Sequence, residues 1–344
     1  MPRRRRTLAA PPPDPFGEHR RAQRLTRAQL LGGSFEFETD HPRLLQLVRT
    51  AYAGLPAHRL AARAPRLRVR LTLAPPRAAL RAEPGLIRPL AGHGLLCGVM
   101  DGASFSALSP RHRSALIVVA RELLRYPYHA RYELLEFSVY VLAARAQRLV
   151  PLHAACLGQR GSGVLLLGAS GAGKSTLVLH AVLSGLELLA EDSVLIRPQG
   201  LKATGIASFV HVRPDSLRFL AAPRRAALLR HSTRIRRRSG IAKLEIDVRG
   251  RRGRLARAPL PIRAVVFLSR RRSDGALLRP LARAAALRRL HAAQRYAATQ
   301  PGWRAFRARI ARLPAYELRR GEHPQQAVAE LRALLARTRR GARG

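Results

Sequence analysis

The chain has little cysteine and few aromatic residues. Its 344 residues include 2 cysteines, and phenylalanine, tryptophan and tyrosine together make up 5%. Two cysteines cannot supply a disulfide framework, so we expect a reducing compartment. No apolar run approaches the roughly 18 residues of a membrane span. The arginine-rich start, residues 1–13, lacks the apolar segment of a secretory signal. These absences predict a soluble, cytoplasmic protein with no membrane partner.

Acidic residues are also scarce. Aspartate and glutamate number 20 against 64 lysines and arginines, which gives a formal charge of +44. Such basicity is typical of nucleic-acid binding. The only lysines, however, are Lys174, Lys202 and Lys243, and arginine and alanine fill permissive positions along the whole chain. This even spread favours a compositional bias over a selected basic surface, so no nucleic-acid partner is expected. An ATPase associated with nucleic acid stays open as an alternative.

The length predicts two domains. Residues 1–25 are rich in arginine and proline and are expected to be disordered. Residues 26–130 read as a small α+β domain, with strands at 35–37 and 67–73 and a helix at 41–52. A long, buried helix is expected at 131–149, at the start of a second domain covering residues 131–336. Residues 337–344 form a basic tail. The oligomeric state, a homo-oligomer included, is left open.

The most specific motif lies in the second domain. It reads Gly168-Ala169-Ser170-Gly171-Ala172-Gly173-Lys174-Ser175-Thr176 and fits the phosphate-binding P-loop pattern. An apolar strand (164–167) precedes it and an apolar-periodic helix (176–183) follows it, as the motif requires. The backbone N–H groups and the helix N-terminus would bind the phosphates of a nucleotide such as ATP. Lys174 would reach the β- and γ-phosphates, and the Ser175 hydroxyl would ligate Mg²⁺.

Two adjacent acids follow the next predicted strand, 186–190. Glu191 and Asp192 come directly after this apolar run. A carboxylate at a strand end beside a P-loop suits Mg²⁺, and a second one could accept a proton from an attacking hydroxyl. The alternative is a solvated acidic turn. Further strands are expected at 193–197, 209–212, 244–248 and 264–269, with a closing helix at 325–335. The fold class predicted is α/β, a P-loop domain with a central mixed sheet behind the small α+β domain.

Two further features have competing interpretations. His153 precedes the P-loop strand and could bind phosphate or move a proton, although a histidine of the core is an equally ordinary reading. Glu245 and Asp247 alternate along a predicted strand, which favours an exposed strand face over a role in the site. Before this strand, residues 224–240 are rich in arginine and are expected to be mobile.

Together these segments resemble the HPr kinase/phosphorylase family, specifically its C-terminal P-loop kinase domain and the HPr kinase-related kinases of the A type. The resemblance is carried by four elements within residues 153–196. They are His153-Ala154-Ala155, the P-loop with Ser170 at its third position, Gly185 after the helix, and Ala190-Glu191-Asp192 after the strand. The segment 133–137 before His153 and the segment 313–318 are also similar. Thr176 stands where true HPr kinases often have glutamate, and Glu191 where they have aspartate.

The resemblance implies a serine kinase-like phosphotransferase that uses ATP and Mg²⁺ and has a protein or peptide acceptor. His153 would assist proton transfer and bind phosphate, Glu191 would activate the acceptor hydroxyl, and Asp192 would help Ser175 hold the metal. A small molecule remains open as the acceptor. The alternative function is a nucleotide-sensing or ATP-hydrolysing regulatory protein without kinase activity, which the longer Glu191 side chain would permit.

Overall fold

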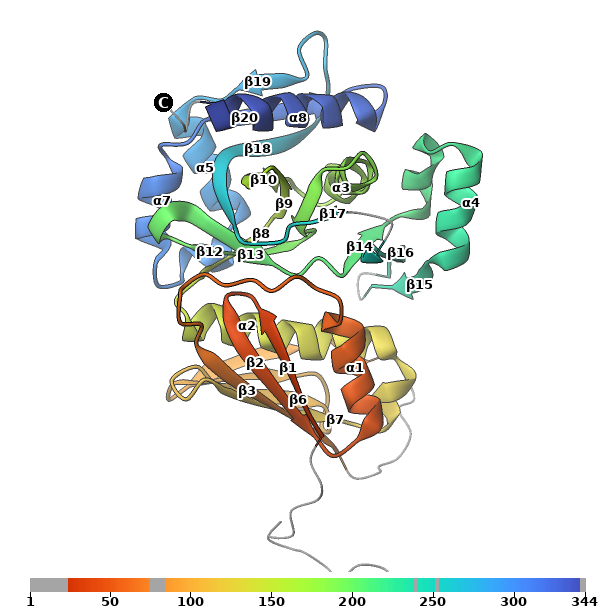
Figure 1. Ribbon diagram of the computed structural model, residues 1–344, viewed down its shortest axis with the longest axis vertical. Helices are drawn as coiled ribbons and strands as arrows, with labels where there is room; N and C mark the ends of the chain where they lie inside the picture. Colours follow the sequence, from red (N-terminus) through yellow and green to blue (C-terminus); the bar gives the residue numbers. More distant parts are fainter. Residues whose placement is uncertain (1–23, 75–83, 238–239, 251–253, 341–344) are drawn as a thin grey trace, which may run out of the picture.

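The computed structural model describes residues 24–74, 84–237, 240–250 and 254–340. Two large sheets lie one above the other, with helices between them and around the upper sheet (Figure 1). Nearly all of the predicted disordered segment 1–25 lies outside the described residues. Its last two members, Arg24 and Leu25, belong to a strand.

The lower sheet is built by the N-terminal part of the chain. Its seven strands lie in the order β1-β2-β3-β7-β6-β5-β4, with β2, β3 and β7 mutually parallel and the other neighbours antiparallel. Strand β3 alternates buried and exposed residues, so one face of the sheet is apolar. The bounds are β1 (Arg24–Leu30), β2 (Gly33–Thr39), β3 (Arg66–Leu73), β4 (Arg88–Gly92), β5 (Leu95–Val99), β6 (Phe105–Ser109) and β7 (Ser114–Val119).

Helices cover the apolar face of this sheet. They are α1 (Pro42–Tyr52), the short η1 (Glu122–Arg125), the π-helical η2 (His129–Glu136) and α2 (Phe137–Ala146). The long helix predicted for 131–149 is therefore a π-helical segment followed by an α-helix. Leu134, Leu135, Val139 and Leu142 pack into one core with Phe35, Phe37 and the other inward residues of the lower sheet. This helix thus contributes its buried face to the N-terminal core.

The upper sheet carries the P-loop. Its strands lie in the order β17-β11-β9-β10-β18-β13-β12-β8, and β20 pairs with β18 and β19. Strands β10, β18 and β20 run parallel and most other pairs antiparallel, so the predicted central mixed sheet and α/β class are confirmed. The bounds are β8 (Val150–His153), β9 (Ala155–Gln159), β10 (Ser162–Leu167), β11 (Glu187–Ala190), β12 (Ser193–Arg197), β13 (Lys202–Gly205), β17 (Arg254–Leu255), β18 (Leu260–Arg272), β19 (Leu278–Pro280) and β20 (Ala315–Arg320).

Helices bury both faces of the upper sheet. On β10, Val164 and Leu166 pack with α3 (Lys174–Leu183) and α8 (Pro324–Arg340), whereas Leu165 and Leu167 pack on the other face. That second face is covered by α5 (Arg283–Ala293), α6 (Arg295–Ala298) and α7 (Trp303–Ile310). A continuous apolar run is what a strand buried on both faces requires. Helix α8 continues through Arg340, into the predicted basic tail.

A third, small sheet lies beside α3 (Figure 1). It consists of β14 (Phe209–Val212), β16 (Ala242–Asp247) and β15 (Thr233–Arg236), in that order. Helix α4 (Ala222–His231) and β15 occupy the segment predicted to be mobile, so no continuous loop is present there. Arginine and alanine are both strong helix formers, and the density of positive charge concealed this helix.

Two short helical turns complete the fold, η3 (Gln199–Leu201) and η4 (Pro214–Phe219). Across the described ranges, no helix is both long and apolar enough to cross a membrane.

Candidate functional site

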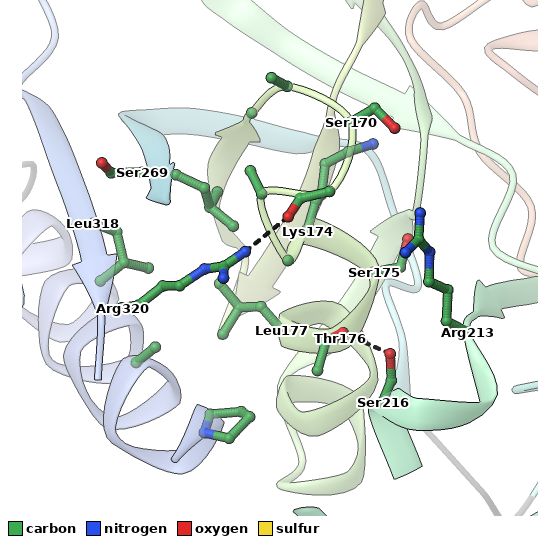
Figure 2. Close-up of a pocket in the computed structure, with 18 of the residues that line it drawn as sticks. Ser170, Lys174, Ser175, Thr176, Leu177, Arg213, Ser216, Ser269, Leu318 and Arg320 are labelled. Carbon is green, nitrogen blue, oxygen red and sulfur yellow. Dashed lines mark hydrogen bonds between the residues drawn. The ribbon is translucent and has the colours of Figure 1, made fainter. Parts of the chain in front are cut away.

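The P-loop connects β10 to α3, as the sequence predicts. Gly171 and Gly173 have φ values of 78° and 97°, a left-handed conformation that costs glycine little. Gly173 is the N-cap of α3, so the helix begins at Lys174 with its free N–H groups turned toward the loop. Arg320 donates a hydrogen bond of 2.8 Å to the Gly171 carbonyl oxygen and supports the loop from β20 (Figure 2). The site therefore has the backbone donors that a phosphate group needs.

Lys174 is buried and contacts both acids that follow β11. Its Nζ donates to a carboxylate oxygen of Asp192 and lies 3.4 Å from the Glu191 carbonyl oxygen. Burial alone would raise the pKa of Asp192, but Lys174, His153 and Arg237 together lower it to about 2. The acid pair thus lies against the P-loop lysine and is not a solvated turn.

Glu191 points to the hydroxyl of the P-loop serine. The Ser175 Oγ donates to Glu191 Oε1, and the Glu191 side chain is buried. Burial would raise the pKa of Glu191, but a contact with His211 and the charge of Lys174 lower it overall. Glu191 is therefore an ionised, buried carboxylate beside the hydroxyl expected to ligate Mg²⁺.

His153 lies at the end of β8, beside Asp192. Strands β8 and β12 pair so that His153 faces Ser193, which places the histidine Nε2 3.3 Å from Asp192 Oδ1. The backbone N–H and carbonyl of His153 are both held by the Gln294 side chain, each at 2.9 Å. The His153 side chain is 64% exposed, so it is not a residue of the core. Loss of water at the cavity wall and the charge of Lys174 lower its pKa, although Asp192 opposes this.

Behind Glu191 runs a buried series of alternating charges that the sequence analysis missed. His211 lies 3.7 Å from Glu191 Oε2 through Nδ1 and 2.9 Å from Glu245 Oε1 through Nε2. Arg131 in turn donates to both Glu245 and Glu136. Burial lowers the pKa of His211, but the two glutamates reverse this and raise it, which favours the imidazolium. This series, Glu191–His211–Glu245–Arg131–Glu136, is called the charge ladder below.

The charge ladder corrects the expectation for β16. Glu245 is buried against His211 and Arg131, so this position is not part of an exposed strand face. Asp247, two residues on, pairs instead with Arg249. The available signal was the scarcity of acids: a glutamate in an apolar strand of so basic a chain needs a buried partner.

Arg237 is a further residue that composition concealed. It comes from the arginine-rich segment, and its Nη1 lies 3.9 Å from Asp192 Oδ2. Its guanidinium also lies 5.5 Å from the ring centroid of Tyr132 in η2. A residue expected on a mobile loop thus closes the cation cluster around Asp192.

A cavity of about 570 Å³ opens over the P-loop (Figure 2). Asp192, Asp215 and Glu322 are its acids, and eight cations line it: Lys174, Arg213, Arg218, Arg237, Lys243, Arg272, Arg319 and Arg320. Thr176 and Ser216 also line this cavity and share a hydrogen bond of 2.8 Å. The volume suits a small molecule and the lining suits a polyanion, for which a nucleoside triphosphate is one candidate. This space is called the nucleotide cavity below.

The donor set fits Mg²⁺ held jointly with a nucleotide. The Ser175 hydroxyl and the Glu191 carboxylate are in contact. The Asp192 carboxylate contacts the neighbouring Lys174. Mg²⁺ prefers oxygen ligands and is usually held by one or two protein groups plus substrate phosphates. Within the described ranges no group of three or more histidine, cysteine, aspartate or glutamate side chains could hold a metal by itself.

No family model and no curated protein matches the chain. One similar solved structure is the Hpr(Ser) kinase/phosphatase from Coxiella burnetii, at 15% identity and a TM-score of 0.29. The match covers 55% of this chain and 90% of that one. Identity and superposition at this level do not assign an activity to the chain.

Proposed function

We propose that this chain is an ATP- and Mg²⁺-dependent kinase that transfers a phosphoryl group to a hydroxyl, most simply that of a serine. The observation that carries the proposal is the convergence of Lys174, Ser175, Asp192 and His153 on the wall of a cation-lined cavity, with Glu191 bonded to Ser175. Phosphoryl transfer depends mainly on positioning and on neutralising charge, and these residues supply both.

The proposed reaction moves one phosphoryl group from ATP to the acceptor oxygen. The acceptor oxygen attacks the γ-phosphorus and forms the new O–P bond. The bond from the γ-phosphorus to the β–γ bridging oxygen breaks, and ADP leaves with the electron pair. The hydroxyl proton passes to a carboxylate of the site. Lys174 and the arginines of the cavity neutralise the phosphate oxygens, and bound Mg²⁺ would neutralise the β- and γ-oxygens further.

The contacts favour an assignment of the two acids that differs from the one implied by the resemblance. Glu191 contacts the Ser175 hydroxyl, the group expected to ligate Mg²⁺, so we assign Glu191 and Ser175 to holding Mg²⁺. Asp192 lines the cavity and contacts His153, so we assign Asp192 to receiving the proton, with His153 orienting it. Both acids remain members of the proposed site.

The first test compares Lys174→Ala with Lys202→Ala. Lys202 is an exposed lysine of β13 that lines no part of the nucleotide cavity, so it is a matched control. We expect Lys174→Ala to weaken binding of Mg²⁺-ATP and to abolish transfer from radiolabelled ATP to serine peptides, with Lys202→Ala unchanged. Full transfer by Lys174→Ala would refute the P-loop assignment. ATP hydrolysis without transfer to any acceptor would favour the nucleotide-sensing alternative.

A further inference from the structure

A second cavity, of about 750 Å³, lies between the lower and upper sheets. Strands β4 and β5 contribute Leu90 and Leu96, and the η2–α2 segment contributes Tyr132, Phe137 and Tyr140. The upper sheet contributes the end of β8 and the residues after β11, and α6 contributes Tyr296. The wall thus combines both halves of the chain.

The two cavities share two residues, His153 and Asp192. These are the residues that we assign to moving the acceptor proton. A hydroxyl presented from the second cavity would therefore meet the carboxylate of Asp192 at the point where the nucleotide cavity begins. Neither cavity alone would bring an acceptor and a triphosphate to the same carboxylate.

The two cavities differ in charge. Eight cations and three acids line the nucleotide cavity. Two arginines, Arg145 and Arg295, the imidazolium of His211 and four acids line the second one, the acids being Glu133, Glu136, Glu191 and Asp192. The whole chain has 64 lysines and arginines against 20 acids, so a cavity wall would ordinarily be rich in cations. In the second cavity the acids outnumber the arginines instead. Arg145 is in addition bonded to the Gln300 side chain. His211 is paired with two glutamates, so a negatively charged group would find few free cations in this cavity.

The opening of the second cavity is apolar. Leu90, Phe137 and Tyr296 all line it, and they are 61%, 36% and 58% exposed. The described part of the chain exposes eight large apolar residues in all, so these three form a concentration of apolar surface at one place. Exposed apolar surface of this kind marks a binding site.

We propose that the second cavity is the acceptor site, and that it selects an apolar group bearing a hydroxyl and no negative charge. This inference rests on the proposed kinase function and names its substrate class. The same chemistry is offered by a serine flanked by apolar residues in a peptide and by a small apolar alcohol. Tyr132, Phe137 and Tyr296 contact the apolar part, while the hydroxyl faces Asp192 and His153.

Photolabelling tests where the acceptor binds, independently of catalysis. The first probe is a serine peptide with leucine neighbours and one benzoylphenylalanine, and the second is 4-(hydroxymethyl)benzophenone. Mass spectrometry of the labelled chain should place the adducts on η2, α2, α6 or β4 for at least one probe. A version of the peptide with glutamates replacing the leucines should label at least about 10-fold less, because a largely apolar wall with few free cations does not compensate the desolvation of a carboxylate. Adducts outside the cavity with both probes would overturn the proposal.

Transfer assays with the same probes then identify the source of the hydroxyl. We expect kcat/KM to favour the leucine peptide over its glutamate version by about 100-fold, within the discrimination a pocket with charges can reach. Phosphorylation of 4-(hydroxymethyl)benzophenone in preference to the peptide would identify the small alcohol as the source. Transfer that prefers the glutamate peptide would contradict the proposal.

A matched pair of variants separates this cavity from the rest of the surface. Leu90→Glu adds a charge at its opening, and Leu116→Glu makes the same change at another exposed leucine, in β7, that does not line it. Leu90→Glu should raise the acceptor KM by at least about 10-fold with unchanged ATP affinity, the scale of a lost pocket contact. Equal effects of the two substitutions would refute the assignment. Labelling of the cavity with no transfer from bound ATP would refute the kinase function and leave the binding site standing.

Discussion

Removing Arg131 from the charge ladder should strongly destabilise the protein. The Arg131 side chain is 3% exposed, and it is bonded to Glu136 and Glu245. Arg131→Met preserves much of the side-chain volume but removes the guanidinium that pairs with the carboxylates of Glu136 and Glu245. Glu245 keeps His211, whereas burial already raises the pKa of Glu136 despite the bond to Arg131. Breaking a buried ion pair costs about 3–5 kcal/mol, a large part of the roughly 5–15 kcal/mol of a typical fold.

The assay is urea unfolding followed by circular dichroism at pH 7, with a matched surface variant. Arg27 and Glu36 also form an ion pair, at 2.9 Å, but the arginine is 70% exposed. Arg27→Met should cost no more than about 1 kcal/mol, because exposed ion pairs contribute little. Adding Glu136→Gln to Arg131→Met should recover part of the loss, since it removes one orphaned charge. If Arg131→Met costs as little as Arg27→Met, or if the second substitution recovers nothing, the buried ion pairs of the charge ladder do not stabilise the fold.

Three other substitutions test the site. Asp192→Asn should cost about 2 kcal/mol of stability at pH 7, because a pKa lowered from 3.8 to about 2 is worth 1.36 kcal/mol per pH unit. This contribution is present above pH 4 and is lost as the pH falls toward 2, so wild type and variant should converge in urea unfolding at low pH; a constant difference would count against it. Glu191→Gln should raise the Mg²⁺ concentration needed for half-maximal nucleotide binding, whereas Asp192→Asn should slow transfer at least about 100-fold and leave that concentration unchanged. The reverse pattern would restore the assignment implied by the family resemblance. His153→Ala should slow transfer and remove the acid limb of the pH–rate profile, which lies below pH 6.5 because the pKa of the ring is lowered; an unchanged profile would remove His153 from the chemistry.

The sequence predicted the features of this site that are local. The P-loop, its strand and its helix lie within about 20 consecutive residues, and their apolar periodicity is unambiguous. The acid pair could be found because a strand end followed by two acids is rare in so basic a chain. Both predictions depend only on residues that are adjacent in the sequence, so one amino-acid sequence is enough to make them.

The remaining features depend on contacts between distant segments. Arg131 lies in η2 and Glu245 in β16, 114 residues apart, so no spacing in the sequence connects them. Glu245 alternates with Asp247, which indicates exposure, and only the tertiary partners Arg131 and His211 reverse that reading. Arg237 was hidden for another reason, because one cation among 64 lysines and arginines carries no compositional signal.

The contact between Lys174 and Asp192 has a consequence for the timing of the proposed reaction. In the nucleotide-free protein the lysine keeps the carboxylate a very weak base. A triphosphate in the P-loop would draw Lys174 toward its own oxygens, and the pKa of Asp192 would then rise. The group that must take the acceptor proton would thus become basic only when the phosphoryl donor is in place. In the proposed reaction, an acceptor that binds before the triphosphate would therefore face a carboxylate too weakly basic to take its proton.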